Sequence, residues 1–289
     1  MNGFIFLAGM TVGVVAVFVI QTFRMKRFDL SDEILNLSPA KHHWGNLGYW
    51  ENTQDYQTAC QQLAVKVADA AGLNNESELI DIGFGTGEQL LLWHQRYQVK
   101  HITGVNTSQA QVGLAQQKIK HHNVSAFLHH FDHSAVNTQP DRSFTHLLSV
   151  DAAYFFNDKE QWFKQNLRIL KPEGAMVVTD MVMPQQPSDL LQEFIMRLAL
   201  WLCGIPKENV ITLDDYQKQL AEAGFSQVET EDLSEFVMDG FAHWLPTYQA
   251  SFAGLKDAPI WHKYTGTARL LSWLRKHDLL RYYLIKAKR

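Results

Sequence analysis

Cysteine is almost missing from this chain, which has only Cys60 and Cys203 among its 289 residues. Two cysteines so far apart form neither a disulfide framework nor a zinc-ligand spacing, and their scarcity is typical of a reducing compartment. An excess of positive charge is missing as well, because 26 Lys and Arg are outnumbered by 30 Asp and Glu. Nucleic-acid-binding proteins usually have a basic face, so we expect no nucleic acid partner.

Charge of either sign is absent from residues 4–20, which are mostly Val, Phe, Ile, Ala, Leu and Gly. Together with residues 21–23 this run reaches roughly 20 residues, the length that a bilayer-spanning helix needs. Arg24, Lys26 and Arg27 follow it and no Lys or Arg precedes it, so the positive-inside rule places the rest of the chain on the cytoplasmic side. We predict a single-pass membrane anchor over residues 1–23, with a cleaved signal peptide and a buried helix as the alternatives.

Strand-like and helix-like patterns alternate from residue 79 onward. Strands are predicted at residues 79–82, 101–105, 124–130, 144–150 and 175–181, and helices at 89–97, 108–121 and 159–170. Such alternation favours an α/β fold with a parallel sheet and helices on both faces. A helix at 56–71 precedes this region, and it is followed by helices at 188–203 and 213–223, a strand at 225–233, a mostly helical stretch at 236–280 and a last strand at 281–287.

These patterns divide the chain into four predicted parts. Residues 1–23 are the anchor, and residues 24–75 are a linker with N-terminal lid helices. Residues 76–183 form a ligand-binding core, and residues 184–289 form a helical cap with the last two strands of the sheet. No internal repeat and no low-complexity tract interrupts this order.

A glycine-rich turn joins the first strand of the core to its helix, and it reads Asp81-Ile-Gly83-Phe-Gly85-Thr-Gly87-Glu88. Glycine adopts positive φ and lets a ligand approach the backbone, and the N–H groups that begin a helix can bind polar ligand atoms. A dinucleotide-binding turn would read G-x-G-x-x-G, but Glu88 stands where its third glycine would fall. A nucleotide P-loop is excluded too, because no Gly-Lys-Ser/Thr follows.

This turn resembles motif I of class I S-adenosylmethionine-dependent methyltransferases. The segment from Gly104 to Gln111 resembles the Gly-φ-x-x-Ser-x-x-Gln pattern of members that act on small molecules and lipids, such as the tocopherol and cyclopropane-forming groups. Leu167-Arg-Ile-Leu-Lys-Pro-Glu173-Gly resembles the family's R-x-L-K-P-G-G turn, with Glu173 in place of the first glycine. The resemblance implies a Rossmann-like, seven-stranded, mostly parallel sheet, S-adenosylmethionine as cofactor and methyl transfer as the activity.

The resemblance also implies which residues bind the cofactor. Asn106 takes the place of the acidic residue that holds the ribose in many relatives, and its amide can still bond a diol. Asp132 is expected to accept from the adenine amine, and Tyr49, in a Gly-Tyr-Trp segment, to close over the cofactor. The full expected cofactor-binding set is Tyr49, Asp81, Gly83, Gly85, Gly87, Asn106, Thr107, Gln111, Asp132 and Val150.

The methyl group on a sulfonium is already activated, so the enzyme mainly aligns donor and acceptor and excludes water. We name His43, Asp151 and Tyr154 as candidate catalytic residues, with His243 as a further candidate base. Many relatives have a His near Phe155, and its replacement here weakens any imported base role. A metal is not expected, because neighbouring residues such as His129 and His130 point to opposite faces of a strand.

The predicted cap is rich in apolar side chains, which favour a hydrophobic acceptor pocket or, alternatively, a cap core that never touches substrate. These residues are Phe194, Ile195, Leu198, Leu200, Trp201, Leu202, Phe236, Val237, Phe241, Trp244, Leu245, Phe252, Trp261 and Trp273. With the anchor, they lead us to expect a small lipophilic acceptor methylated at a membrane.

Several alternatives stay open. A cyclopropane-forming or other lipid C-methylating enzyme is one, and a membrane-anchored scaffold that keeps the cofactor fold without catalysis is another. Gly9 and Gly13, a small-xxx-small pair within the predicted anchor, also leave a homodimer possible.

Overall fold

The computed structural model describes residues 32–37, 42–257 and 259–289. The predicted anchor over residues 1–23, with its Gly9 and Gly13 pair, lies outside these residues. Among the helices that the structure describes, none is long and apolar enough to cross a membrane.

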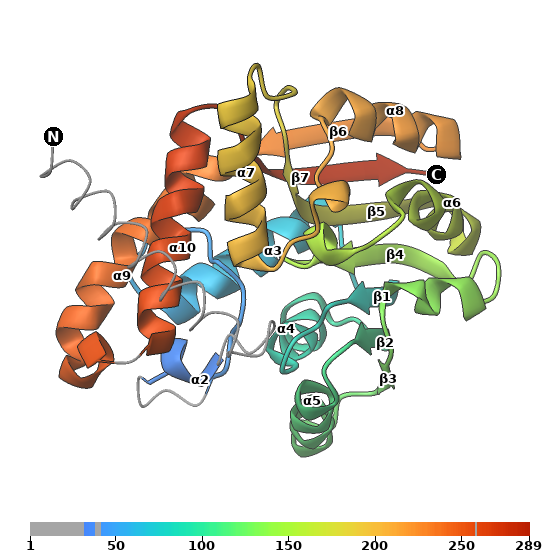
Figure 1. Ribbon diagram of the computed structural model, residues 1–289. Helices are drawn as coiled ribbons and strands as arrows, with labels where there is room; N and C mark the ends of the chain where they lie inside the picture. Colours follow the sequence, from blue (N-terminus) through green and yellow to red (C-terminus); the bar gives the residue numbers. More distant parts are fainter. Residues whose placement is uncertain (1–31, 38–41, 258) are drawn as a thin grey trace, which may run out of the picture.

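A seven-stranded sheet organises the molecule, with the order β3-β2-β1-β4-β5-β7-β6 (Figure 1). Its strands are β1 (Glu78–Ile82), β2 (His101–Asn106), β3 (Ala126–His130), β4 (Phe144–Ser149), β5 (Leu170–Val182), β6 (Ser226–Asp232) and β7 (Arg281–Lys288). The strands β1 to β5 run parallel, whereas β7 lies antiparallel between β5 and β6. The predicted Rossmann-like, seven-stranded, mostly parallel sheet is therefore confirmed.

Helices cover both faces of this sheet, because successive side chains of a strand point to opposite faces. Leu148 packs in the same core cluster as Leu63 of α3 and Trp93 of α4, whereas its neighbour Leu147 packs with Phe163 of α6. Both faces are thus apolar, as expected for a parallel sheet buried on two sides. The helices are α3 (Tyr56–Ala71), α4 (Glu88–Tyr97) and α5 (Gln109–His121) on one face, and α6 (Lys159–Ile169) and α8 (Leu213–Ala223) on the other.

A helical cap stands at the end of the sheet where the parallel strands finish (Figure 1). It consists of α2 (Asp32–Leu35), α7 (Leu190–Cys203), the π-helical turn η4 (Glu235–Asp239), α9 (Gly240–Ser251) and α10 (Pro259–Lys276). Trp244 of α9 stacks on Tyr56 with ring centroids 4.9 Å apart and contacts Tyr248 at 4.5 Å. Trp50 contacts the same indole at 5.1 Å. This aromatic cluster joins the cap to the N-terminal segment.

The cap's apolar residues fall into two groups. Val237, Phe241, Trp244, Leu245 and Trp261 are buried in the main core cluster, so they act as cap core in the structure. Other members of the expected set are exposed, namely Phe194, Leu198 and Trp273. The alternative of a cap core therefore describes part of the set, and the exposed part lies mainly on α7.

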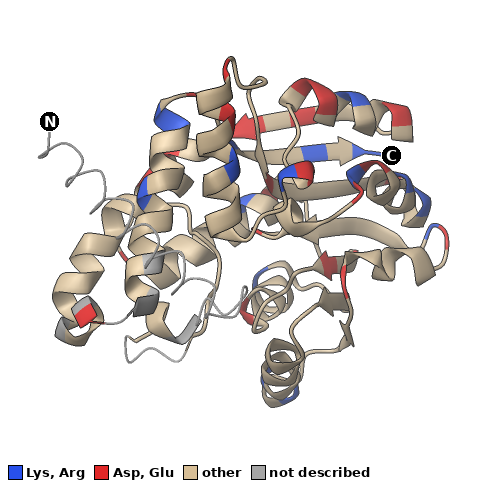
Figure 2. Ribbon diagram, viewed as in Figure 1, with Lys and Arg blue, Asp and Glu red and all other residues tan. Residues whose placement is uncertain are grey.

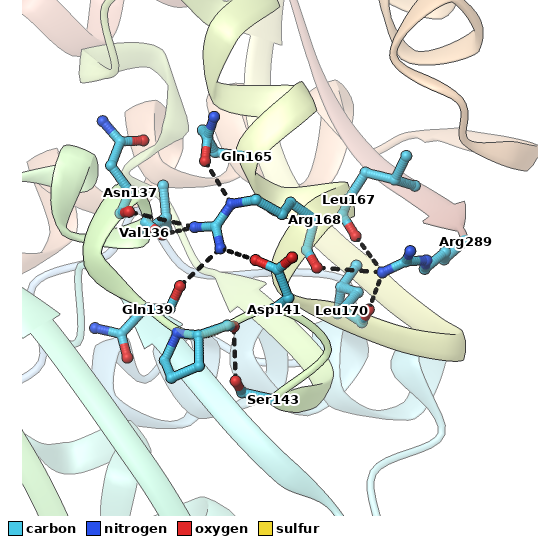
Figure 3. Close-up of polar contacts among 11 residues, drawn as sticks. Val136, Asn137, Gln139, Asp141, Ser143, Gln165, Leu167, Arg168, Leu170 and Arg289 are labelled. Carbon is cyan, nitrogen blue, oxygen red and sulfur yellow. Dashed lines mark hydrogen bonds and ion pairs between the residues drawn. The ribbon is translucent and has the colours of Figure 1, made fainter.

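Two arginines secure the opposite end of the sheet (Figure 3). Arg168, at the end of α6, donates to the carbonyls of Val136 at 2.9 Å and Gln139 at 2.8 Å and pairs with Asp141. Arg289 donates to the carbonyls of Leu167, Arg168 and Leu170, where α6 passes into β5. The carbonyls that end a helix lack partners within it, so these guanidinium groups satisfy backbone acceptors.

Candidate active site

The glycine turn after β1 has the backbone that its sequence predicts. Gly83, Gly85 and Gly87 have φ values of 91°, 59° and 93°. A Cβ at Gly83 would stand 2.6 Å from the Cβ of Ala152, and one at Gly87 would stand 2.8 Å from the Cβ of Ala115. At Gly85 nothing lies within 4 Å. The turn is thus closely packed at its two ends and open in its middle.

The helix α4 begins directly after this turn, and Gly87 at its N-cap supplies no side-chain hydrogen bond. The first N–H groups of a helix have no partner within it, and they lie at the positive end of the helix dipole. The open middle of the turn and these donors together make a cradle for a polar ligand.

Asp81, the residue of β1 two positions before the turn's first glycine, holds the helix that follows the turn. Its side chain is fully buried, and its carboxylate accepts from Gln89 Nε2 at 2.8 Å and from Trp93 Nε1 at 2.7 Å. Burial raises the pKa of Asp81 to about 6, although both hydrogen bonds favour the charged form. Asp81 therefore fixes α4 against β1, and direct contact between its carboxylate and a cofactor stays a prediction.

Three of the expected cofactor residues meet beside the turn. Asn106, at the end of β2, donates through Nδ2 to the carbonyl of Gly85 at 3.0 Å and to Oε1 of Gln111 at 2.9 Å. Ser108 caps the N-terminus of α5 and thereby places Gln111 one turn into that helix. Because both amide hydrogens of Asn106 have acceptors, its Oδ1 is the atom that would receive a ribose hydroxyl.

Other expected residues lie around this group. Val150 is buried at the end of β4. Thr107 is exposed, and its carbonyl lies 3.0 Å from His130 Nε2. Asp132 is exposed and accepts from the N–H of Ser134 at 2.8 Å, and hydrogen bonds from Ser134 lower its pKa. In the part of the chain that the structure describes, no cluster of His, Cys, Asp and Glu is arranged to hold a metal ion.

Tyr49 lies in the wall between the N-terminal segment and the cap. Its hydroxyl donates to Glu51 Oε2 at 3.0 Å, and its ring contacts Phe236 at 5.1 Å. Lys66 Nζ stands 5.0 Å from the ring centroid. Burial and the hydrogen bond to Glu51 raise the pKa of Tyr49 to about 12. Closure of this tyrosine over a cofactor stays a prediction, because its contacts in the structure lie with Glu51 and the cap.

Asp151 is the centre of a second polar group, directly after β4. Its Oδ1 accepts from the hydroxyls of Tyr154 at 3.0 Å and Tyr282 at 2.8 Å, and its Oδ2 accepts from the N–H of Leu47 at 2.7 Å. Its own N–H donates to Thr179 Oγ1 at 2.7 Å. Asp151 has φ 57°, a left-handed backbone that costs free energy in a non-glycine residue and is typical of functional positions.

Burial raises the pKa of the Asp151 carboxyl, against the hydrogen bonds from Tyr282, Leu47 and Tyr154 that lower it. A carboxylate with a raised pKa is a better proton acceptor near neutral pH. Burial also raises the pKa of Tyr154 and of Tyr282 well above 10, which keeps both hydroxyls protonated as donors.

The N-terminal segment is pinned over the glycine turn by Glu88. Its buried carboxylate accepts from Lys118 Nζ at 2.5 Å, from the N–H of His43 at 2.9 Å, and lies 3.0 Å from His42 Nδ1. Thr86 Oγ1 donates to the carbonyl of His43 at 2.5 Å. Burial would raise the pKa of Glu88, but these hydrogen bonds outweigh it and lower the pKa. We call Thr86, Glu88, Lys118 and residues 42–43 the lid clamp.

The structure brings two of the candidate catalytic residues together and leaves the others apart. Asp151 and Tyr154 share a hydrogen bond, whereas the side chains of His43 and His243 are exposed. Sequence reasoning missed Tyr282, which lies 131 residues from Asp151 in the chain, and no local signal marks it. It also missed the role of Glu88, although a carboxylate at a glycine position was a visible signal.

The residues present fit S-adenosylmethionine. The open side of Gly85 and the uncapped start of α4 offer backbone donors, and Asn106 offers an acceptor next to them. Asp151 follows β4 and lies at the same end of the sheet as the glycine turn, because β1 and β4 are parallel neighbours. Cofactor groups and a reacting acceptor group can therefore meet at one edge, as is usual for open α/β sheets.

Known proteins are similar to this chain in sequence. A family described as "Methyltransferase domain" matches residues 80–178. Erythromycin 3''-O-methyltransferase of Saccharopolyspora erythraea is 30% identical over 215 residues, which cover 71% of this chain and 69% of the relative. 27-O-demethylrifamycin SV methyltransferase of Amycolatopsis mediterranei is 26% identical over 224 residues, with 76% and 79% covered.

The fold is also shared with a solved structure. The crystal structure of a mycolic acid cyclopropane synthase complexed with SAH and CTAB superposes with a TM-score of 0.73 and 16% identity, covering 91% of this chain and 95% of that one. The turn, the strand order and these relatives agree with one another. The chain therefore belongs to the class I S-adenosylmethionine-dependent methyltransferases of the small-molecule type, with S-adenosylmethionine as its cofactor.

Proposed function

We propose that this methyltransferase is anchored in a membrane through residues 1–23, faces the cytoplasm and methylates a hydroxyl group of a small lipophilic acceptor. The observation that carries the choice of a hydroxyl is Asp151, a partly buried carboxylate with a raised pKa at the site edge of the sheet. Two relatives named above support it, because their names place the methyl group on hydroxyl oxygens of erythromycin and rifamycin precursors.

The chemistry assigns one task to each group of residues. When bound, S-adenosylmethionine supplies a methyl group that its sulfonium has already activated. Gly83, Gly85, Gly87 and the start of α4 would hold its polar end, and Asn106 would accept from its ribose. The Asp151 carboxylate accepts the proton of the acceptor hydroxyl as that oxygen becomes the ether oxygen of the product. Tyr154 and Tyr282 orient the carboxylate through their hydrogen bonds.

The lipophilic acceptor is supported by the apolar setting of Tyr154, which donates to this carboxylate. Tyr154 belongs to the same apolar cluster as Met183, which follows β5, and Met196 and Leu200 of α7. Apolar walls with a few fixed polar groups are usual for small-molecule sites. An acceptor that dissolves in a bilayer would also explain why a chain with an uncharged N-terminal run carries this site.

Transfer of label from methyl-labelled S-adenosylmethionine tests the proposal. The full chain is incubated with membrane lipids extracted from its source, and the products are divided between an organic and an aqueous phase. We expect label in the organic phase, as a methyl ether that resists mild base. Label in aqueous products alone would contradict the lipophilic acceptor, and label absent from both phases would favour the non-catalytic scaffold.

The Asp151→Asn variant tests the base. We expect kcat to fall by about 10²- to 10⁴-fold, because proton removal is lost, while the affinity for S-adenosylmethionine measured by calorimetry stays as in the wild type. Tyr282→Phe is the matched control, since it removes one donor and keeps the carboxylate. Without this donor the pKa of Asp151 should rise further, so the acidic limb of the kcat/KM profile should move to higher pH. An unchanged kcat in Asp151→Asn would reject Asp151 as the base.

Carbon methylation is the second candidate, and the shared fold with a cyclopropane synthase favours it. The two reactions differ in their products, because methylation of an alkene forms a new carbon–carbon bond whereas methylation of a hydroxyl forms a new carbon–oxygen bond. Mass spectrometry of the labelled lipid separates them: a methyl ether supports the proposal, and a cyclopropane or branched chain supports carbon methylation.

A further inference from the structure

The outward face of α7 (Leu190–Cys203) carries large apolar side chains from Leu190 to Leu198. Leu190 is 85% exposed, Leu191 66% and Phe194 63%, and Leu198 one turn further on is 39% exposed. Residues three or four apart lie on the same side of a helix, so these four side chains form one continuous stripe. We call it the α7 stripe. A soluble protein surface rarely gathers large apolar side chains in this way, and such patches usually mark an interaction site.

The other face of α7 packs against the core, so the helix that carries the stripe is firmly attached. Met196, Ala199 and Leu200 are buried in the main core cluster. Glu193 and Arg197 form an ion pair at 2.6 Å on the flank of the helix, where their charges cancel. The helix thus has apolar side chains inward and outward, and only a narrow polar flank between them.

The neighbouring helix α10, which packs against α7, is basic. Its sequence contains no Asp or Glu, and Arg269, Trp273 and Lys276 recur at a helical spacing on its exposed side. Figure 2 shows Lys and Arg on the adjoining ribbons of α7 and α10. Tryptophan beside exposed basic residues is typical of helices at the boundary between anionic headgroups and acyl chains.

The described segment that follows the predicted anchor in sequence is fixed to the cap. Residues 21–31 connect the apolar run to Asp32, a linker that extends to at most about 40 Å. The segment that follows is fixed to the cap, because the Tyr248 hydroxyl of α9 accepts from the N–H of Leu37 at 3.0 Å and donates to the carbonyl of Ile34 at 3.1 Å. A bilayer that holds the run therefore lies within reach of α7.

We propose that the α7 stripe inserts into the headgroup and acyl boundary of an anionic bilayer, with the exposed basic residues of α10 on the headgroups. This inference rests on the proposed membrane anchor and names a second contact with the same membrane. The segment after α7 is joined to the site, because Asn209 Nδ2 donates to the carbonyl of Tyr154 at 3.2 Å.

Site-specific photocrosslinking in the full chain tests the contact. The variant Phe194→p-benzoylphenylalanine is reconstituted into vesicles of equal parts phosphatidylcholine and phosphatidylglycerol, and irradiation joins the benzophenone to whatever lies against it. Phe127→p-benzoylphenylalanine is the matched control, since Phe127 is 75% exposed on β3, at the opposite edge of the sheet from β6. We expect phospholipid adducts at position 194 and none at position 127.

The possible outcomes distinguish the α7 contact from the proposed anchor and the proposed activity. Adducts of equal yield at both positions, adducts to a second copy of the chain at position 194, or no lipid adduct there would overturn the α7 contact. Vesicle flotation reports on the anchor separately: a chain that floats but forms no adduct at 194 keeps its anchor and loses only this contact. A chain that does not float overturns both. Labelled methyl transfer in detergent reports on the enzyme activity independently of either result.

Discussion

The two ends of the sheet use polar groups in opposite ways. At the end where the parallel strands begin, Arg168 and Arg289 donate hydrogen bonds to backbone carbonyls and to one carboxylate (Figure 3). At the end where those strands finish, Asp151 and Gly83 have positive φ, and Asp151 stays partly exposed. The first end gains stability from satisfied acceptors. The second end keeps an accessible carboxylate, which can serve binding and chemistry.

The family resemblance by itself does not separate these ends. The phrase around Arg168 and Lys171 identifies the family as strongly as the glycine turn does, yet its arginine lies far from the strand ends that carry the site. A residue can therefore be characteristic of a family because the fold requires it. The following variants test the contrast between the two ends, from the largest expected effect to the smallest.

Gly83→Ala should have the largest effect and act on both stability and binding. The new Cβ would lie 2.6 Å from Ala152 Cβ at a φ of 91°. We expect the free energy of unfolding to fall by about 4 kcal/mol from strain and overpacking, and calorimetry to show no binding of S-adenosylmethionine. Gly113→Ala is the matched control, because a Cβ there meets nothing in α5. Binding retained by Gly83→Ala would refute the contrast.

Arg168→Met should destabilise the fold and leave the site intact. It removes the donors to the carbonyls of Val136 and Gln139, and we expect a loss of about 3 kcal/mol in urea unfolding. The affinity for S-adenosylmethionine of the folded variant should match the wild type. Lys164→Met, on the same helix, removes only an exposed pair with Glu160 and should have no measurable effect. Weaker cofactor binding in Arg168→Met would show that the two ends are coupled.

Asp81 should make stability depend on pH. Its pKa is about 6 in the folded chain and 3.8 as the ordinary value, so the folded state binds more protons than the unfolded state between these limits. Its contribution therefore falls as pH rises from about 4 to 6, by at most about 3 kcal/mol. Denaturant unfolding of wild type and Asp81→Asn across this range measures the difference in slope. Parallel curves would show that the pKa of Asp81 is not raised.

Glu88→Gln should weaken the lid clamp with a smaller effect. The amide loses the charge that pairs with Lys118, and we expect a loss of about 1 kcal/mol with faster hydrogen exchange at the N–H of His43. Because the pKa of Glu88 is lowered, its contribution is present above the ordinary carboxyl pKa and disappears as pH falls through the lowered value. Lys118→Met should give the same result, whereas Lys120→Met, exposed on the same helix, should not. An unchanged rate of hydrogen exchange at the N–H of His43 in Glu88→Gln would show that Glu88 does not hold this segment.

Most elements of the core were predictable because their signals are local. The strand β1, the helix α4 and the caps of α5 follow from apolar runs, glycines and Ser108 within a few residues of each boundary. The position of β7 was not predictable in the same way, since an antiparallel strand between β5 and β6 depends on pairing with strands that are distant in the chain. Its consequence is Tyr282 at Asp151.

The sequence by itself determined the glycine turn, the strand-and-helix alternation and the family, because each depends on backbone preferences and spacing over short distances. The tertiary structure decided what each polar group does. It turned Asp81 inward to α4, gave Asp151 two donors from distant segments and used Glu88 to hold residues 42–43. It also divided the cap's apolar residues between a buried core and the exposed α7 stripe. Hydrophobicity predicts that a side chain seeks burial, but only packing against distant elements decides which side chains are covered.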